Sequence, residues 1–235
     1  MDPEVAVVED PRDRYIARVV AGKSFLDVGG LWGVVNEKIS VAHAAGASSL
    51  AMLDICVPEH ELWTAFEARR TQLGVGEVRC LARDVQALAP DFPRFDVVHC
   101  SGVLYHVPDP FRLLAALHRI TRHYLVLTTV VTGERVECAA GALTVPAAAA
   151  IFVPALADAE REILRGYWTA FVGDAAWGLT REVEAWGARD YVPWWWLPTR
   201  HAVERMCEAA GFRTEARASM WNDNAYTLLL RTAED

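Results

Sequence analysis

The stretch FLDVGGLWG at residues 25–33 places one acidic residue and three glycines at the end of an apolar run. A glycine-rich turn between a strand and a helix lets the backbone approach a ligand at φ values that other residues resist. The usual ligand of such a turn is a nucleotide. The turn therefore predicts an α/β domain and marks Asp27, Gly29, Gly30 and Gly33 as candidate ligand contacts.

Apolar runs and helical patterns alternate through the first half of the chain. The expected strands are residues 23–30, 48–55, 77–85, 95–102 and 123–131, and the expected helices are 11–21, 34–45, 58–73 and a helix after the capping residue Asp109. Nearly continuous apolar strands that alternate with helices predict a parallel sheet covered on both faces. Ligands bind such sheets at the carboxyl ends of the strands.

The alternation stops after residue 131. Residues 132–190 contain an amphipathic helix around Ile163–Val172 and little strand signal. Thr199 is a plausible cap for a helix that ends at Gly211, and a strand pair follows around the turn WNDN. We expect a cofactor-binding α/β core over 1–131, an inserted helical cap over 132–198, and a C-terminal helix with a closing strand pair over 199–235.

The composition excludes several classes of protein. A net charge of -8 argues against a general binder of nucleic acid or of membrane surfaces, which needs a basic face. The five cysteines are scattered without a CxxC pair, which is typical of reduced thiols and not of a zinc site. The first residues lack a signal-peptide pattern and no apolar run has membrane-spanning length. A cytoplasmic protein is the expectation.

Acidic residues stand at three successive strand ends. Asp27 would repel a pyrophosphate, whereas it would attract the cationic amino-acid end of S-adenosylmethionine, directly or through water. Asp54 is placed to accept hydrogen bonds from both ribose hydroxyls. Asp84 is placed to accept from the adenine amine while the Val85 N–H meets a ring nitrogen. Asp54 and Asp84 have helix capping as their alternative role.

Four segments resemble the motifs of the class I S-adenosylmethionine-dependent methyltransferases. They are LDVGGLWG, MLDI, ARDV and FDVVHCSGVLYHVPDP, and SGVLYHVPDP is especially similar to the group of tRNA wobble-uridine carboxymethyltransferases and related small-molecule methyltransferases. The resemblance implies a Rossmann-like seven-stranded methyltransferase sheet with helices on both faces. It adds Ile55, Ser101 and Gly102 to the cofactor-binding candidates. Leu31, followed by Trp32, departs from the pattern because the family usually has glycine there.

The methyl acceptor is expected just past the fourth strand, near His106. A histidine there is suited to take a proton from an attacking hydroxyl or amine, and a structural role is the equal alternative. Methyl transfer needs mainly alignment in a shielded site, so a base is optional. Nine tryptophans, many after residue 160, favour an aromatic acceptor pocket.

The sequence therefore predicts methyl transfer from S-adenosylmethionine to oxygen or nitrogen of a small-molecule acceptor, with secondary metabolism as a plausible setting. One alternative is a tRNA-modifying methyltransferase, which needs a basic patch drawn from Arg119, Arg122, Arg181, Arg189 and Arg200. A nicotinamide-dependent oxidoreductase is a second, and Asp27 and Asp84 speak against it. A non-catalytic binding module is a third, favoured by Leu31 and Trp32. An exposed aromatic cap is also compatible with a homodimer face.

Overall fold

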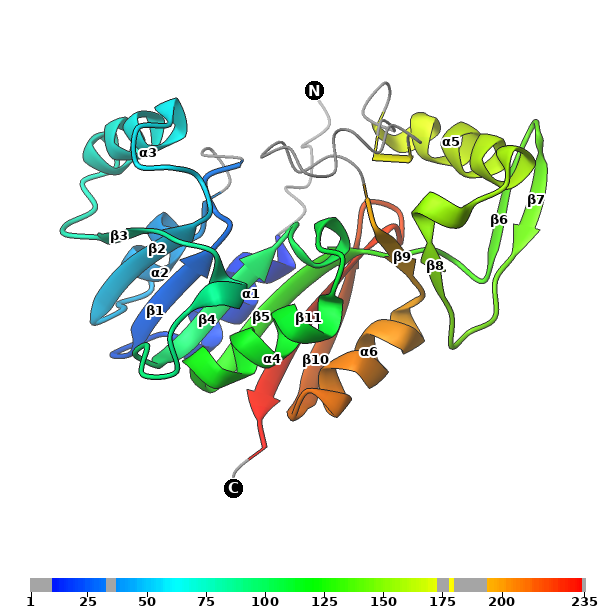
Figure 1. The fold of residues 1–235 in the computed structure, drawn as a ribbon. Helices are drawn as coiled ribbons and strands as arrows, with labels where there is room; N and C mark the ends of the chain where they lie inside the picture. The colour runs from blue at the N-terminus through cyan, green and yellow to red at the C-terminus, as the bar shows by residue number, and fades with distance from the viewer. Residues whose placement is uncertain (1–9, 33–36, 173–177, 180–193, 234–235) are drawn as a thin grey trace, which may run out of the picture.

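The computed structural model describes residues 10–32, 37–172, 178–179 and 194–233. Seven strands form the central sheet: β1 (Ser24–Val28), β2 (Ser49–Asp54), β3 (Arg79–Ala82), β4 (Phe95–Ser101), β5 (Thr121–Val130), β10 (Phe212–Met220) and β11 (Ala225–Thr232). Their order across the sheet is β10-β11-β5-β4-β1-β2-β3, as Figure 1 shows. The predicted seven-stranded α/β sheet is confirmed.

Strand direction fixes where a ligand can bind. The first five strands run parallel, and β10 and β11 close the sheet in antiparallel pairing. Strand β1 pairs with β2 on one side and with β4 on the other, so the order reverses between β1 and β4. A crevice at such a reversal, outside the carboxyl ends of the strands, is the usual ligand site of this architecture.

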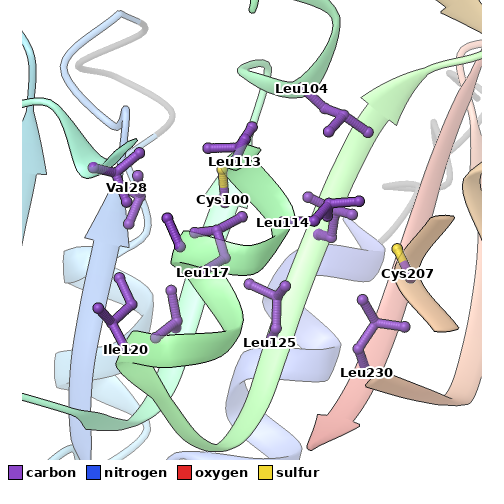
Figure 2. Packing of buried hydrophobic residues seen from close by; sticks show 14 of the residues in the cluster. Val28, Cys100, Leu104, Leu113, Leu114, Leu117, Ile120, Leu125, Cys207 and Leu230 are labelled. Atoms are coloured by element: carbon purple, nitrogen blue, oxygen red, sulfur yellow. The ribbon is translucent and has the colours of Figure 1, made fainter. Parts of the chain in front are cut away.

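Helices cover both faces of the sheet. One face carries α1 (Pro11–Val19), α2 (Ile39–Ala44) and α3 (Glu61–Gln72), and the other carries α4 (Pro110–Ile120) and α6 (Arg200–Ala209). Each face has its own buried apolar cluster, and Figure 2 shows the α4–α6 side, where Leu113, Leu117 and Leu125 pack together. Asp10, Asp109 and Thr199 accept backbone N–H bonds as helix caps, in agreement with the sequence for Asp109 and Thr199.

The middle of the chain forms a separate layer beside the sheet. It contains β6 (Arg135–Cys138), β7 (Gly141–Thr144), β8 (Ala150–Phe152), α5 (Asp158–Val172) and β9 (Trp196–Pro198). Strands β6 and β7 pair, as do β8 and β9, so the expectation of little strand structure here was wrong. These strands have only three or four residues, too few to show an alternating pattern in the sequence. No helix in the described ranges combines the length and apolar character that crossing a membrane requires.

Several element boundaries differ from the predicted ones, and three of them bear on the site. Helix α3 begins at Glu61 instead of residue 58, because the His60 ring accepts from the Leu62 N–H and caps it. Helix α2 begins at Ile39, and residues 34–36 of the predicted helix lie outside the described residues. Strand β3 ends at Ala82, since Asp84 caps the short 3-10 turn η2 (Val85–Ala87).

Candidate functional site

The predicted cofactor residues lie along one edge of the sheet. Asp27 pairs across the sheet with His99, and Asp54 and Ser101 end the strands on either side of β1. Asp84 lies two residues beyond Ala82, which pairs with Asp54. The fold therefore brings the three acids to the ends of the adjacent strands β1, β2 and β3, beside the reversal of strand order between β1 and β4.

Asp27 is fully buried and both its oxygens have protein partners. Its Oδ1 lies 2.7 Å from His99 Nδ1, and its Oδ2 accepts the Lys38 N–H at 2.8 Å. The second bond ties the end of the loop that follows β1 back to the strand. Asp27 thus closes the base of the glycine-rich loop, and a ligand ammonium would have to share a carboxylate that already holds the loop in place.

The glycine turn is packed too tightly for side chains at two positions. Gly29 has φ +77°, and a Cβ there would lie 2.6 Å from Val103 Cγ2. A Cβ on Gly30 would lie 2.6 Å from Asp27 Oδ2. Gly33, the third predicted glycine contact, lies outside the described residues.

Leu31 and Trp32 are accommodated without crowding the turn. Leu31 is completely buried in the cluster between the sheet and α1, α2 and α3, and its φ is not left-handed, so no glycine is required there. Trp32 is half exposed, and its side chain hydrogen-bonds to Cys56 beyond the end of β2. The departure from the family pattern therefore leaves the turn intact.

Asp54 is buried and rigidly held. Its Oδ1 accepts the Cys56 N–H at 3.0 Å and its Oδ2 accepts the Leu31 N–H at 3.3 Å. A carboxylate oxygen accepts more than one hydrogen bond, so both oxygens retain capacity for two hydroxyl donors. The neighbouring Ile55 is half exposed and offers an apolar surface at the rim. Burial and the Asp54 charge raise the pKa of the Cys56 thiol to about 12, which keeps it protonated.

Asp84 serves as a cap. Its Oδ1 accepts the Gln86 N–H at 2.8 Å at the start of η2, and Val85 is buried beneath. The capping role that the sequence left open is thus present, and it uses one of the two carboxylate oxygens.

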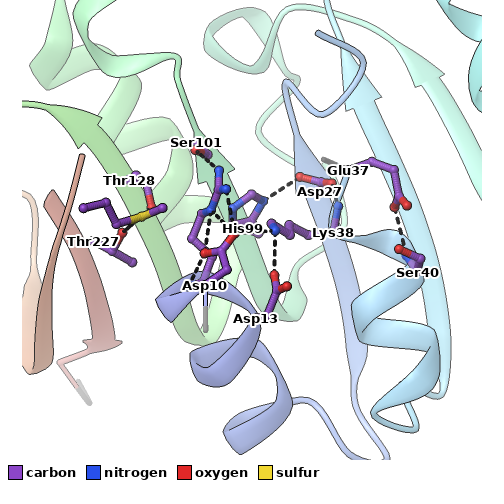
Figure 3. A network of polar contacts seen from close by, with 12 residues as sticks. Asp10, Asp13, Asp27, Glu37, Lys38, Ser40, His99, Ser101, Thr128 and Thr227 are labelled. Carbon is purple, nitrogen blue, oxygen red and sulfur yellow. Dashed lines mark hydrogen bonds and ion pairs between the residues drawn. The ribbon is translucent and has the colours of Figure 1, made fainter. Parts of the chain in front are cut away.

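A charged network that the sequence did not indicate surrounds the start of α1 (Figure 3). Arg12 donates to Ser101 Oγ at 3.3 Å, and the buried Lys38 ammonium lies 2.9 Å from Asp10 and 2.5 Å from Asp13. Burial raises the pKa of Asp10, but hydrogen bonds from Arg12 and Lys38 outweigh it and hold the pKa well below its usual range. The network places Arg12 beside the end of β4, where it can meet a ligand carboxylate.

Tyr105 and His106 lie in the 3-10 turn η3 (Leu104–His106), just past the end of β4. Their rings are 4.2 Å apart. A Cβ built on Gly102, which has φ +77°, would lie 3.7 Å from the Tyr105 hydroxyl, so that hydroxyl overlies the turn at the strand end. Burial raises the pKa of Tyr105 to about 12, so the phenol stays protonated. Sequence reasoning named His106 and missed Tyr105.

Two cavities lie away from the acids. One, of about 480 Å³, lies between the start of α4, α6 and the β8–β9 pair, with Phe111, Trp196 and Met206 in its lining. The other, of about 240 Å³, is lined by Trp168, Phe171, Trp221 and Asn222. Within the described ranges, no group of three or more His, Cys, Asp or Glu side chains is arranged to hold a metal ion.

The sheet order, the glycine turn and the acids at the strand ends define a fold of the class I methyltransferase type. Residues 6–216 match the family model described as a methyltransferase domain, and the chain belongs to this family.

The ubiquinone biosynthesis O-methyltransferase of Azotobacter vinelandii is 37% identical over 106 residues, which is 44% of this chain and 41% of that protein. The chain thus spans less than half the length of the curated relatives it matches. Magnesium protoporphyrin IX methyltransferase from Synechocystis, solved with S-adenosylhomocysteine, is 15% identical with a TM-score of 0.59, covering 95% of this chain and 82% of that one. The 1,6-didemethyltoxoflavin-N1-methyltransferase of Burkholderia thailandensis is 14% identical with a TM-score of 0.55, covering 98% and 82%. These two likenesses concern the fold.

Proposed function

We propose that this chain is an S-adenosylmethionine-dependent methyltransferase that acts on an oxygen or nitrogen atom of a small-molecule acceptor. The observation that carries the proposal is Asp54, a buried carboxylate fixed by two backbone N–H groups beside the Gly29 turn. Family membership supports it, as does the O-methyltransferase activity in the name of the Azotobacter relative. S-adenosylmethionine supplies a methyl group on an electrophilic sulfonium, so the protein's task is to bind and align.

Each strand end has its own part of the cofactor to hold. Asp54 accepts from the ribose hydroxyls and Ile55 packs on the adenine. Asp84 accepts from the adenine amine, and the Val85 N–H meets a ring nitrogen. The methionine end of the cofactor is assigned to Asp27, Gly29, Gly30 and Gly33. Ser101 and Gly102 form the floor beneath the sulfonium. We add Arg12 for the methionine carboxylate, because it already donates to Ser101 Oγ and is mostly buried.

The binding site for the methyl acceptor is assigned to η3 and to the middle layer of the chain. Residues 132–198 act as the cap over the acceptor, and the backbone carbonyl of Tyr105 accepts the Trp195 N–H at 2.7 Å, which joins cap and core. His106 is the candidate base. Tyr105, half-buried and with its phenol protonated, donates a hydrogen bond to the acceptor and helps to orient it.

Calorimetry with S-adenosylhomocysteine and with NADH tests the cofactor. We expect micromolar binding of S-adenosylhomocysteine and no binding of NADH. Asp54→Asn should weaken the binding of S-adenosylhomocysteine. Transfer of a labelled methyl group from S-adenosylmethionine to a panel of phenols and aromatic amines tests the reaction. Failure to bind S-adenosylhomocysteine would overturn the proposal in favour of a binding module.

The tRNA alternative finds little support in the described arginines. Arg119 donates to the Leu88 carbonyl, Arg122 pairs with Asp96, and Arg200 pairs with Asp223. Arg181 and Arg189 lie outside the described residues. A small acceptor therefore remains the better-supported substrate class.

A further inference from the structure

The turn between β10 and β11 has a strained backbone. Trp221, Asn222 and Asp223 all have left-handed φ values, of 51°, 51° and 71°. For residues with a Cβ this conformation is unfavourable, somewhat less so for Asn and Asp. Strain of this kind persists where the surroundings enforce it, and it gathers at ligand sites.

Buried Asn224 enforces the turn. Its side-chain amide donates to the carbonyls of Trp221 at 3.1 Å and Asn222 at 3.3 Å. Its Oδ1 accepts from the Tyr167 hydroxyl at 2.8 Å, which ties the turn to α5. The result is that Trp221 stands 54% exposed, an unusual position for so large an apolar ring.

The exposed ring borders the cavity of about 240 Å³, opposite the side chains of α5. Phe171, on that helix, is also 38% exposed, and Trp168 and Asn222 complete the described lining. A cavity of about 150 Å³ is enough for a benzene ring. The space therefore suits a planar molecule of one or two rings between aromatic walls.

Trp168 lines the cavity from the side of α5. Its side chain is 1% exposed, and its indole N–H has no hydrogen-bond partner in the part of the chain that the structure describes. Leaving a buried donor unsatisfied lowers the stability of the fold. The indole nitrogen is closed to solvent, so it is the apolar surface of the Trp168 ring that borders the cavity.

The cavity lies on the edge of the sheet that carries the cofactor residues. Ala225, the first residue of β11, pairs with Val130 at the end of β5, and Thr128 of β5 pairs with Ser101. β11 is two strands from β4, a separation of roughly 10 Å. The rings of Tyr105, Trp194 and Trp168 bridge this interval, with centroid distances of 5.5 Å and 4.8 Å.

We propose that this cavity binds an aromatic ring of the methyl acceptor, remote from the atom that is methylated. The inference rests on the proposed function and specifies its substrate class. Binding energy from a remote part of a substrate can hold the reacting atom in place.

Calorimetric titration with 2-naphthol, in the presence of saturating S-adenosylhomocysteine, tests the site. Decahydro-2-naphthol serves as the saturated control because it keeps the hydroxyl and loses the planar rings. The variants are Trp221→Leu, which removes the aromatic wall, and Trp221→Phe, which keeps one. Phe111→Leu is the matched control, since Phe111 is 51% exposed and does not line this cavity.

The expected result is that 2-naphthol binds at least tenfold more tightly than decahydro-2-naphthol. Trp221→Leu should weaken 2-naphthol binding about tenfold, while Trp221→Phe and Phe111→Leu change it less than threefold. Absence of 2-naphthol binding, or equal binding to Trp221→Leu and wild type, overturns the inference. If either of these results is found while S-adenosylhomocysteine still binds, only the inference about the cavity is overturned. If the wild type does not bind S-adenosylhomocysteine, the proposed function itself is overturned.

Discussion

Asp27 and His99 face each other across the β1–β4 pairing, and a 2.7 Å contact joins the carboxylate to the imidazole Nδ1. Both side chains are buried: Asp27 is 0% and His99 is 3% exposed. A carboxylate removed from water needs donors in place of the water molecules it loses. His99 and the Lys38 N–H are the recorded donors, so the imidazole fixes the residue that closes the glycine-rich loop.

Replacing His99 by Leu should weaken cofactor binding without touching the cofactor. Asp27 would keep the Lys38 N–H as a donor and lose the imidazole. An unsatisfied buried group costs about 1–3 kcal/mol. We expect about a tenfold loss of S-adenosylhomocysteine affinity by calorimetry, together with a lower melting temperature. His99→Asn, whose amide can donate from nearly the same place, should recover most of the affinity. His43→Leu, at an exposed histidine of α2, is the control, and equal affinity in His99→Leu and wild type would contradict the role.

Replacing Asp54 by Asn should cost more affinity than replacing Asp84 by Asn. Asp54 is 1% exposed and held by two N–H groups, so its hydrogen bonds to a ligand form in a site shielded from water. Hydrogen bonds to a charged group contribute about 1.5–3 kcal/mol, which corresponds to a ten- to hundredfold loss of affinity. Asp84 is half-buried and already caps η2, so a loss below tenfold is expected there.

Binding of the 2′-deoxy analogue of S-adenosylhomocysteine directly tests whether Asp54 holds the ribose. If Asp54 holds the ribose, the analogue should bind the wild type more weakly, and Asp54→Asn should bind both compounds nearly alike. A full preference for the ribose form in Asp54→Asn would move that role to another residue.

Gly29→Ala separates backbone strain from steric overlap. Gly29 and Gly46 have similar left-handed φ values of +77° and +82°, but a Cβ meets Val103 only at Gly29. Gly46→Ala should therefore show the backbone cost alone, about 1 kcal/mol, and Gly29→Ala should lose a further 1–3 kcal/mol or so. Denaturant unfolding measures both. Adding Val103→Ala to Gly29→Ala should restore part of the extra loss, and additive effects would show that the overlap is relieved elsewhere.

Much of the cofactor-binding edge of the sheet could be predicted because its residues carry a signal in their local sequence. Asp27, Gly29 and Asp54 each end or follow an apolar run, and parallel strands align such ends without further information. His99 has a local signal, as a polar residue between Val98 and Cys100 in the middle of the strand FDVVHCSG. Its partner could not be read from the sequence, because the β1–β4 pairing joins residues that are distant along the chain.

The acceptor side could not be predicted in the same way. Tyr105 meets Trp194 through tertiary packing, and three adjacent tryptophans carry no sign of which one turns inward. Trp194 is buried, whereas Trp195 and Trp196 are half-buried and pack on Phe152 in the β8–β9 pair. The strain at Trp221 likewise comes from Asn224 and α5, and the motif WNDN predicts only a turn.

Acid should destabilise the fold in part through Asp96. Burial raises the pKa of Asp96, but hydrogen bonds from Ser24 and the Arg122 guanidinium outweigh it and lower the pKa to about 2. A depressed pKa contributes stability that is present above the unfolded value of 3.8 and is lost as the pH falls toward 2. We expect roughly 1–2 kcal/mol after allowance for solvent screening. The free energy of unfolding, measured at pH 7 and at pH 2.5, tests this contribution. Asp96→Asn should lower the free energy of unfolding at pH 7 and reduce the difference between the two pH values. Asp91→Asn, at an exposed carboxylate, should change neither quantity.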